Sequence, residues 1–337
     1  MSESLALFIE WVIKAALLLL IMLTGFAYTT LYERKLLAKL QIRVGPNRTG
    51  PFGILQPAAD GVKLIFKEEV TPANAYKFAF VLAPMITMIP AIVIMAVVPW
   101  GERVEIFGRQ VLLGITDINV GVLFLLSVAS ISVYGIVLAG WSSNNKYAML
   151  GGLRSTAQMI SYELALGLGF VGPIMAAGSL SLMDIVREQQ TTGWFIFTQP
   201  IGAFVFFIAI LAEVNRAPFD MPEAEQELTA GYHTEYSGMK FSQFFAGEYM
   251  KMIAVSAIWA TLFFGGFDGP LIQDFPWLGP LYLLVKIFFA LGLMIWIRAS
   301  MPRLRYDRLM AFGWKIMIPM ALFSIFLTAA ILMVRGI

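Results

Sequence analysis

Eight apolar runs dominate this chain and limit what it can fold into. They cover residues 5–32, 73–100, 119–141, 156–177, 194–212, 244–267, 282–299 and 314–334, and the fifth is the shortest. A helix of about 20 apolar residues crosses a bilayer. Tryptophans stand at the ends of several runs, where aromatic side chains meet the membrane interface: Trp100, Trp141, Trp194 and Trp314. The pattern predicts an all-α, polytopic membrane protein with about eight transmembrane helices, which form one integral membrane domain over residues 1–337.

Basic residues are distributed unevenly between the two sets of loops. The odd-numbered loops and the span ends beside them carry 16 Lys and Arg, whereas the even-numbered loops and the C-terminus carry 4. Cytoplasmic loops are enriched in these residues, so we expect the odd loops to face the cytoplasm and both termini to face the periplasm. The first run is too long for a cleaved signal peptide and has no basic flank before it, so we expect it to remain as a span.

Composition excludes several kinds of site. The chain has no cysteine and a single histidine, His233. It therefore cannot form disulfides, thiolate metal sites or iron–sulfur ligands by itself, and one histidine cannot supply both axial ligands of a haem. No glycine-rich phosphate loop follows a strand pattern. We expect no metal or cofactor on this chain alone, so the electrons of any redox reaction must arrive from a neighbouring protein.

Acidic residues are concentrated between residues 212 and 238, which hold over a quarter of the 22 Asp and Glu. Prolines on both sides of Asp220 favour a turn and then a short helix, which Asp220 would cap and Gly231 would end. The helix macrodipole accounts for only the two acids of the first turn. Clustered carboxylates at a membrane boundary instead favour an ion or proton path. The acids are Glu213, Asp220, Glu223, Glu225, Glu227 and Glu235.

Ionisable residues also fall inside the apolar runs. Glu163 in the fourth run is the clearest intramembrane carboxylate, and an unpaired charge there costs at least ~2.5 kcal/mol by insertion scales. We therefore expect Glu163 to face the interior of the bundle. Glu248 and Lys251 share a helix face in the sixth run, where they could form a local ion pair or belong to the path. Lys286 and Lys315 are expected to snorkel towards the interface.

The first loop combines basic residues with a turn-rich segment, residues 41–53, and a short amphipathic helix after Pro57. Apolar residues recur there at helical spacing, while Asp60, Lys63 and Lys67 take other faces. From this pattern alone, a surface anchor that binds anionic lipid and a functional contact are equally open.

Four motifs give the chain a family resemblance. They read E-x-x-R-x-P-F-D-x-P-E-x-E-x-E-L-x-x-G-Y-x-T-E-Y from Glu213, Y-E-R-K…Q-x-R-x-G-P-N-R-x-G-P-x-G-x-L-Q-P-x-A-D from Tyr32, G-W-S-S-N-N-K-Y-A-M-L-G-G-L-R-S from Gly140 and R-A-x-x-P-R-x-R-Y-D from Arg298. From Tyr32 to Trp314 the chain resembles the quinone-site membrane subunits of respiratory complex I, which bacterial naming calls the H subunits. Some members have a glutamate where this chain has Ser130, so any proton route through that point must differ here.

The resemblance implies a function and a set of site residues. Such a subunit of the proton-pumping NADH–quinone oxidoreductase forms much of the quinone-binding chamber and couples quinone reduction to proton translocation, but is not active alone. The implied proton relay consists of Glu163, Glu213, Glu223, Glu225, Glu227, Glu235 and Glu248. The implied chamber and tunnel mouth consist of Glu33, Arg34, Arg43, Arg48, Asp60, Arg216, Asp220 and Arg298. Within the chamber wall, Arg216 would balance Glu213 and Asp220.

The resemblance also implies cofactors, partners and a location. Quinone would be the substrate, while NADH, FMN and the iron–sulfur clusters would be held by partner subunits. The partners would be other membrane-arm and peripheral-arm subunits and the lipid of the bacterial inner membrane, with no nucleic acid.

Other interpretations stay open. The equivalent subunit of a related membrane-bound hydrogenase or other dehydrogenase is the nearest alternative, although such relatives tend to depart from the E-A-E-x-E and R-V-G-P-N-R patterns that are intact here. A secondary ion transporter would suit buried carboxylates, but the order of the runs shows no internal repeat. A simple membrane anchor for a soluble enzyme would explain the basic loops but not Glu163, Glu213 and the glutamate cluster.

Overall fold

The computed structural model describes residues 3–106, 109–221 and 231–335, and these are largely helical. The longer helices are α1 (Glu3–Leu40), α3 (Lys77–Met95), α4 (Gly121–Ser142), α5 (Lys146–Ala177), α10 (Gly238–Phe263), α11 (Gly279–Ser300) and α13 (Ile318–Arg335). The shorter helices are α2 (Gln56–Phe66), α6 (Leu182–Thr192), α7 (Phe195–Thr198), α8 (Pro200–Glu213) and α12 (Tyr306–Phe312). Single 3-10 turns are η1 (Pro51–Gly53), η2 (Gly231–His233) and η3 (Pro276–Leu278), and η4 (Gly313–Met317) is a π turn.

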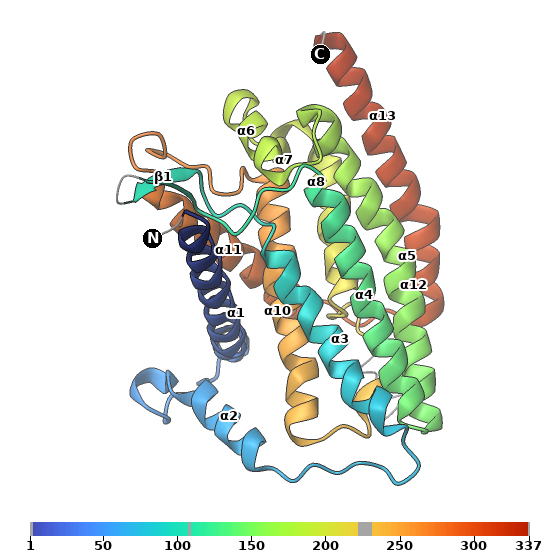
Figure 1. Ribbon diagram of the computed structural model, residues 1–337. Coiled ribbons are helices and arrows are strands. Elements are labelled where there is room, and N and C mark those ends of the chain that lie inside the picture. The colour runs from blue at the N-terminus through green and yellow to red at the C-terminus, as the bar shows by residue number, and fades with distance from the viewer. Residues whose placement is uncertain (1–2, 107–108, 222–230, 336–337) are drawn as a thin grey trace.

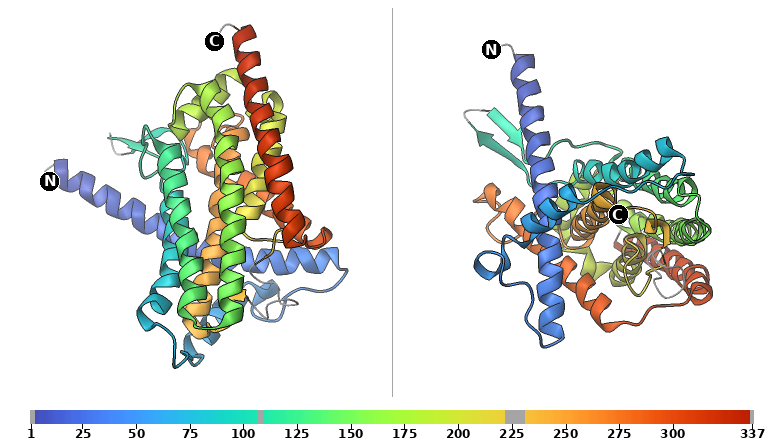
Figure 2. Two further views of the ribbon diagram at one scale, coloured as in Figure 1. Left: turned by 90° about the vertical axis from the view of Figure 1, so that its right-hand side faces the viewer. Right: turned by 90° about the horizontal axis from the view of Figure 1, so that it is seen from below.

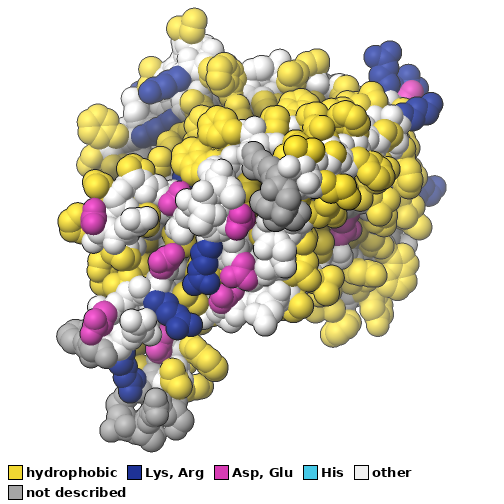
Figure 3. All heavy atoms as spheres, turned by 90° about the horizontal axis from the view of Figure 1, so that it is seen from above, with side chains coloured by type: hydrophobic (Ala, Val, Ile, Leu, Met, Phe, Trp, Pro, Cys, Tyr) yellow, Lys and Arg dark blue, Asp and Glu magenta, His cyan; other side chains and the backbone are white. Residues whose placement is uncertain are grey.

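The longer helices form a bundle. Figure 1 shows α3, α4, α5 and α13 side by side in that order, and α10 packs against α3, α8 and α11. Helix α1 crosses the bundle obliquely and packs on α10 and α11 (Figure 2). Helix α2 lies at one end of the bundle, and α6 and α7 lie at the other (Figure 1). Viewed from the end with α6, charges of both signs gather over one part of the surface, while apolar side chains cover much of the rest (Figure 3).

The all-α membrane fold is confirmed, but the count of eight spans is not. Among the described residues, six helical segments are long and apolar enough to cross a membrane: Leu7–Leu40, Lys77–Met95, Gly121–Ser142, Lys146–Ala177, Pro276–Ser300 and Tyr306–Val334. The fifth predicted span is divided between α7 and α8, and α8 has only 14 residues. The sixth predicted span is α10, with 26 residues. It is not among the six segments, and its charged residues Glu248 and Lys251 lower its mean hydropathy.

Helix α10 forms the centre of the core. Every residue from Tyr249 to Phe263 is buried, although the helix contains charged and polar side chains. Gly247 allows the helix to approach α3 closely, because a Cβ at this position would lie 3.3 Å from the Cα of Met88. Small residues bring membrane helices together in this way. The close packing places the charges of α10 inside the bundle, where they must find partners on other segments.

Two features of the loops bear on the sequence predictions. The amphipathic helix of the first loop is confirmed as α2, which has no buried residue and leaves Phe66 84% exposed. The second loop contains an unpredicted hairpin, in which β1 (Arg103–Ile106) pairs antiparallel with β2 (Arg109–Leu112). Strands of four residues are too short to give a distinct alternating pattern, which is why the sequence did not reveal them.

Candidate functional site

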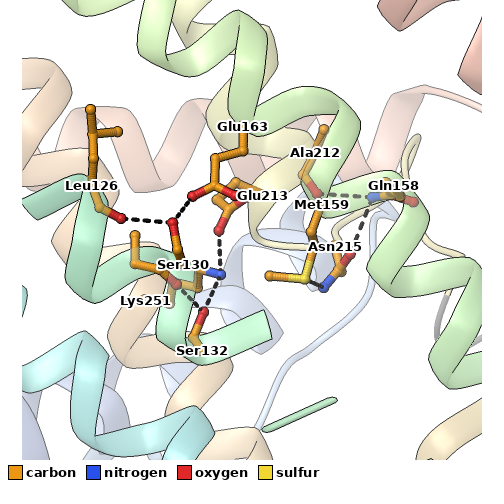
Figure 4. Close-up of polar contacts among 11 residues, drawn as sticks. Leu126, Ser130, Ser132, Gln158, Met159, Glu163, Ala212, Glu213, Asn215 and Lys251 are labelled. Carbon is orange, nitrogen blue, oxygen red and sulfur yellow. Dashed lines mark hydrogen bonds and ion pairs between the residues drawn. The ribbon is translucent and has the colours of Figure 1, made fainter. Parts of the chain in front are cut away.

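The site is organised by a break in the chain at the C-terminal end of α8. Glu213 is the last residue of this helix, and Asn215 adopts a left-handed conformation with φ of 56°. Gln158 of α5 holds the broken end, because its side-chain nitrogen donates to the carbonyl oxygen of Ala212 at 2.8 Å (Figure 4). The same nitrogen donates to the carbonyl oxygen of Phe219 at 2.7 Å. These bonds add to the turn contacts that the same oxygens accept from the backbone amides of Asn215 and Met221, each at 3.2 Å. The chain can therefore turn inside the protein and present Glu213 to α10.

Glu213 forms a buried ion pair with Lys251 of α10. Lys251 Nζ lies 2.6 Å from Glu213 Oε1, and both side chains are less than a tenth exposed. Lys251 also donates to the hydroxyl of Ser132 on α4 at 3.1 Å (Figure 4). The second carboxylate oxygen of Glu213, Oε2, has no hydrogen-bond partner within the described parts of the chain. A buried charge is stable only when it is paired. We call Glu213, Lys251 and Ser132 the Lys251 cluster.

Glu163 lies next to the Lys251 cluster, on α5 (Figure 4). The hydroxyl of Ser130 contacts Glu163 Oε1 and also lies 3.0 Å from the carbonyl oxygen of Leu126. A hydroxyl has one proton to donate and lone pairs that accept. The Ser130 hydroxyl can donate its proton to an ionised Glu163. Alternatively, it can donate to the carbonyl oxygen of Leu126 and accept a hydrogen bond from a protonated Glu163. Ser130 therefore satisfies both protonation states of Glu163, whose charge also interacts with that of Glu213.

Arg216 is the centre of a second group of charges, which we call the Arg216 cluster. One terminal nitrogen lies 3.0 Å from Glu33 Oε1 of α1, and Nε lies 2.6 Å from Glu248 Oε1 of α10. The guanidinium carbon lies 4.5 Å from the centre of the Tyr249 ring, and Arg298 of α11 also contacts Glu33. Burial disfavours the charged guanidinium, but Glu248, Tyr249 and Glu33 outweigh this and raise the pKa of Arg216. The arginine therefore stays charged and holds both acids in the cluster.

The two clusters share two chain segments, the C-terminal end of α8 and the helix α10. Glu213 and Arg216 are three residues apart at the end of α8, and Glu248 and Lys251 are three residues apart on α10. In each cluster an acid of one segment meets a base of the other. Any displacement of α10 relative to the end of α8 therefore changes both ion pairs.

A small cavity of about 30 Å³ lies between the two clusters. Its lining includes Glu248 of the Arg216 cluster and all three members of the Lys251 cluster. Its polar lining also includes Thr87, Asn215 and the imidazole of His233. The cavity therefore connects acids of both clusters inside an otherwise apolar bundle.

Comparisons with known proteins show to which family this chain belongs. The family model described as NADH dehydrogenase matches residues 13–329. The chain belongs to the NADH dehydrogenase family. The resemblance inferred from the four sequence motifs is thereby confirmed.

Relatives in the NADH dehydrogenase family align with this chain over nearly its whole length. The H subunit of the NADH-quinone oxidoreductase of Protochlamydia amoebophila is 54% identical over 308 residues, which cover 91% of this chain and 92% of that protein. The protein of the same name from Thermomicrobium roseum is 50% identical and covers 93% of each chain. An H subunit of the NADH-quinone oxidoreductase of Geobacter metallireducens, the one numbered 2, is 49% identical and covers 97% of this chain and 96% of its own.

The structure brings together part of the relay expected for this NADH dehydrogenase family member. Glu213 and Glu248 line the cavity, and Glu163 lies beside the Lys251 cluster. Glu235 follows η2, where it accepts a hydrogen bond from the side chain of Asn145 at 2.6 Å. The short helix predicted after Asp220 lies outside the described residues, as do Glu223, Glu225 and Glu227.

Two pairings differ from those that we expected. Arg216 was expected to balance Glu213, but Lys251 neutralises Glu213, and Arg216 instead contacts Glu33 and Glu248. Lys251 thus finds its acid on another helix, although a local pair with Glu248 was one of the options. The reason is the turn that separates the two side chains. Glu213 ends α8 and reaches Lys251, whereas Arg216 follows the turn and reaches Glu248 at a different position along α10.

The expected chamber and tunnel-mouth residues separate into an inner and an outer group. Glu33, Arg216 and Arg298 meet in the Arg216 cluster. In the outer group, Arg34 of α1 pairs with Asp60 of α2 at 2.6 Å, with the arginine side chain half exposed. The remaining chamber residues are Asp220, on the segment after α8, and Arg43 and Arg48, which are exposed in the loop between α1 and α2.

Several functional candidates carry little signal in the sequence. Gln158 and Ser132 are polar residues inside apolar runs, and this position is the only signal that could have marked them. Lys286 of α11 reaches the loop beyond the end of α10, where its amine donates to the carbonyl oxygens of Gly266 at 2.8 Å and Asp268 at 2.6 Å. In the part of the chain that the structure describes, no group of three or more His, Cys, Asp or Glu side chains is placed to hold a metal ion.

Proposed function

We propose that this chain is the membrane subunit of a proton-translocating NADH–quinone oxidoreductase, where it forms much of the quinone-binding chamber and couples quinone reduction to proton translocation. Relatives at 49–54% identity carry the name of the H subunit of an NADH-quinone oxidoreductase. The observation that supports coupling is the arrangement of Glu163, Glu213 and Glu248 around counter-charges and a cavity inside an apolar bundle. A membrane anchor would not need such acids, since ionisable groups are costly at this depth.

The proposed relay runs from Glu248 through Glu213 to Glu163. A proton that crosses the cavity binds to Oε2 of Glu213, which accepts no hydrogen bond from the described residues, and neutralises the charge that faces Lys251. Because like charges repel, loss of the negative charge on Glu213 favours ionisation of Glu163, and so favours release of the next proton. Ser130 then turns its hydroxyl from Leu126 to the new carboxylate. Each protonation thus prepares the following acid to release its own proton.

The Arg216 cluster is the chamber side of the proposed relay. A negative charge that develops on a reduced quinone beside this cluster competes with Glu248 for Arg216. Weakening of the 2.6 Å contact between Arg216 and Glu248 leaves the carboxylate less stabilised and more ready to take a proton. The chemistry at the quinone is thereby converted into a protonation change at the cavity. Asp220 and Arg298 complete the chamber wall in this proposal.

The tunnel mouth is proposed to lie at the first loop, with Arg34, Arg43, Arg48 and Asp60. The loop also exposes large apolar side chains, with Ile42 96%, Val44 77% and Phe52 80% exposed. Exposed apolar residues beside arginines are typical of a protein contact. We assign this surface to the peripheral-arm subunits, which would hold NADH, FMN and the iron–sulfur clusters. The chain would bind no cofactor alone and would not be active in isolation.

The proposed location is the bacterial inner membrane, with both termini in the periplasm. The uneven distribution of Lys and Arg supports this orientation. A reporter enzyme that is active only in the cytoplasm should be active after Lys146 and silent at the C-terminus. The opposite result would place the acidic stretch on the periplasmic side and contradict the proposal.

The proposed function is tested by isolating the chain with its partners in a mild detergent. We expect subunits that bind nucleotide, flavin and iron–sulfur clusters to co-purify, and the preparation to reduce quinone with NADH. A preparation with a hydrogenase or a different dehydrogenase module would favour the related-complex alternative. A chain that purifies alone and transports ions would contradict the assignment.

A further inference from the structure

We propose that the cavity between the two charge clusters is a specific water site, and that His233 positions the water molecule in it. The water would hydrogen-bond to Nε2 of His233 and bridge the carboxylates of Glu248 and Glu213. This inference deepens the proposed proton path and rests on that path for its functional part.

The imidazole of His233 needs a partner that the described residues do not provide. Its side chain is buried, and Nε2 has no hydrogen-bond partner in the described parts of the chain. A buried polar atom without a partner carries the full cost of its removal from water. The ring is confined by aromatic neighbours, with centroid distances of 3.8 Å to Tyr232, 5.3 Å to Phe244 and 5.8 Å to Phe241. Because these rings fix the imidazole plane, a mobile partner such as water is the simplest way to satisfy Nε2.

The cavity has the size and the polar wall that a buried water needs. Its volume of about 30 Å³ exceeds the ~10–15 Å³ that a single water requires on the same measure. Glu213 and Glu248 both line the cavity, and Oε2 of Glu213 also has no hydrogen-bond partner among the described residues. The hydroxyl of Thr87 donates to the carbonyl oxygen of Ala83 at 3.0 Å and keeps its lone pairs for a water. Buried waters have two to four polar partners, and this wall provides them.

The proposed role of His233 is to hold the water and not to carry the proton. Burial lowers the pKa of His233 to about 3, so the imidazole is neutral at physiological pH. The ammonium group of Lys251 faces the same cavity and opposes a second positive charge. A neutral imidazole can still donate or accept one hydrogen bond at Nε2. The proton therefore passes along the water between Glu248 and Glu213, while His233 fixes the position of the oxygen.

The water site is tested by maps of the assembled complex that show ordered water, for the parental protein and for His233→Phe. We expect a water within hydrogen-bond distance of Nε2 in the parental protein. The phenyl ring keeps the shape of the side chain but has no polar atom, so this water should be absent from His233→Phe. A dry cavity in the parental protein would overturn the proposal even if the variant failed to assemble.

The functional part is tested in membranes that carry the assembled complex. His233→Phe should lower quinone-linked proton translocation about tenfold, because the water that joins the two acids loses the bond that fixes its position. His233→Gln, which places an amide near the position of Nε2, should retain at least about half of the parental rate. Phe241→Leu is the matched control, since it changes the packing around His233 without lining the cavity. NADH oxidation by a hydrophilic acceptor should be unchanged in all three variants.

The outcomes separate this inference from the proposed function. Parental translocation by a His233→Phe complex that lacks the water would overturn the positioning role. If the water is present and depends on His233 while Glu213→Gln translocates protons normally, the water site stands and the proposed proton path fails.

Discussion

Lys251 Nζ lies 2.6 Å from Glu213 Oε1, and this buried contact joins α10 to the last residue of α8. The pair gives Glu213 a fixed counter-charge at a depth where an isolated carboxylate would be neutral. It also makes the charge of Glu213 depend on a neighbour that is held by Ser132 of a third helix. The acid at the centre of the proposed relay is thus controlled by three segments that are far apart in the sequence.

Lys251→Met should destabilise the assembled complex, because it leaves Glu213 buried without its cation. Loss of one partner of a buried ion pair typically costs about 3–5 kcal/mol. The double variant Glu213→Gln, Lys251→Met has no orphaned charge and should be more stable than Lys251→Met alone. The thermal midpoints of the purified complexes measure this difference. A double variant that is no more stable than the single one would show that the two side chains are not energetically coupled.

Ser130→Ala should slow quinone-linked proton translocation about tenfold, because hydrogen bonds to charged groups are worth ~1.5–3 kcal/mol. The variant removes the hydroxyl that satisfies Glu163 in both protonation states. Ser127→Ala is a matched control on the same helix, where the hydroxyl donates only to the carbonyl oxygen of Leu123 among the described contacts. Rates of proton translocation in membranes test the pair. Equal rates in the two variants would count against a role for Ser130.

The stability of the complex should fall in acid in a way that depends on His233. Burial lowers the pKa of this imidazole from its usual 6.5 to about 3 in the folded protein. Below pH 6.5 the unfolded chain therefore binds a proton that the folded chain excludes, so stability is lost as the pH falls. At pH 5 the loss from this group amounts to ~2 kcal/mol relative to neutral pH. His233→Gln should reduce the difference between thermal midpoints at neutral pH and at about pH 5, whereas an unchanged difference would contradict the buried, neutral state.

The membrane helices were predictable because their signal is local. A run of apolar residues with aromatic ends specifies a helix in lipid without reference to the rest of the chain. Helix α8 and the hairpin were harder, since the first is short and broken and the second has strands of only four residues. The charges inside α10 also lowered the hydropathy of the most deeply buried helix. Its depth comes from tertiary packing against α3, α8 and α11, which no window of sequence shows.

The candidate site was only partly predictable, for a related reason. Acids such as Glu163 and Glu213 stand out because carboxylates are rare in apolar runs. The partners of these acids do not stand out in the sequence, because they are determined by which helices pack together. Arg216 pairs with Glu33, which is 183 residues away in the sequence, and Ser130 of α4 meets Glu163 of α5. A histidine that lines a cavity cannot be told from one that packs in the core until the packing is known.

The central claim is that Glu163 and Glu213 change protonation during turnover, and the most direct measurement is proton translocation by complexes that carry Glu163→Gln or Glu213→Gln. Glutamine keeps the size and most hydrogen bonds of glutamate but cannot lose a proton. Glu10→Gln is the control, since Glu10 pairs only with its helical neighbour Lys14 among the contacts described, away from the site.

In membranes with the assembled complex, both site variants should lose most quinone reduction and the linked proton gradient, while Glu10→Gln should retain them. NADH oxidation by a hydrophilic acceptor, which draws electrons upstream of quinone, should stay near the parental rate. Aspartate at either position should restore part of the activity, because it returns the titratable group with a shorter reach. If both glutamine variants assemble and translocate protons at the parental rate, the acids are structural and the proposed relay is wrong.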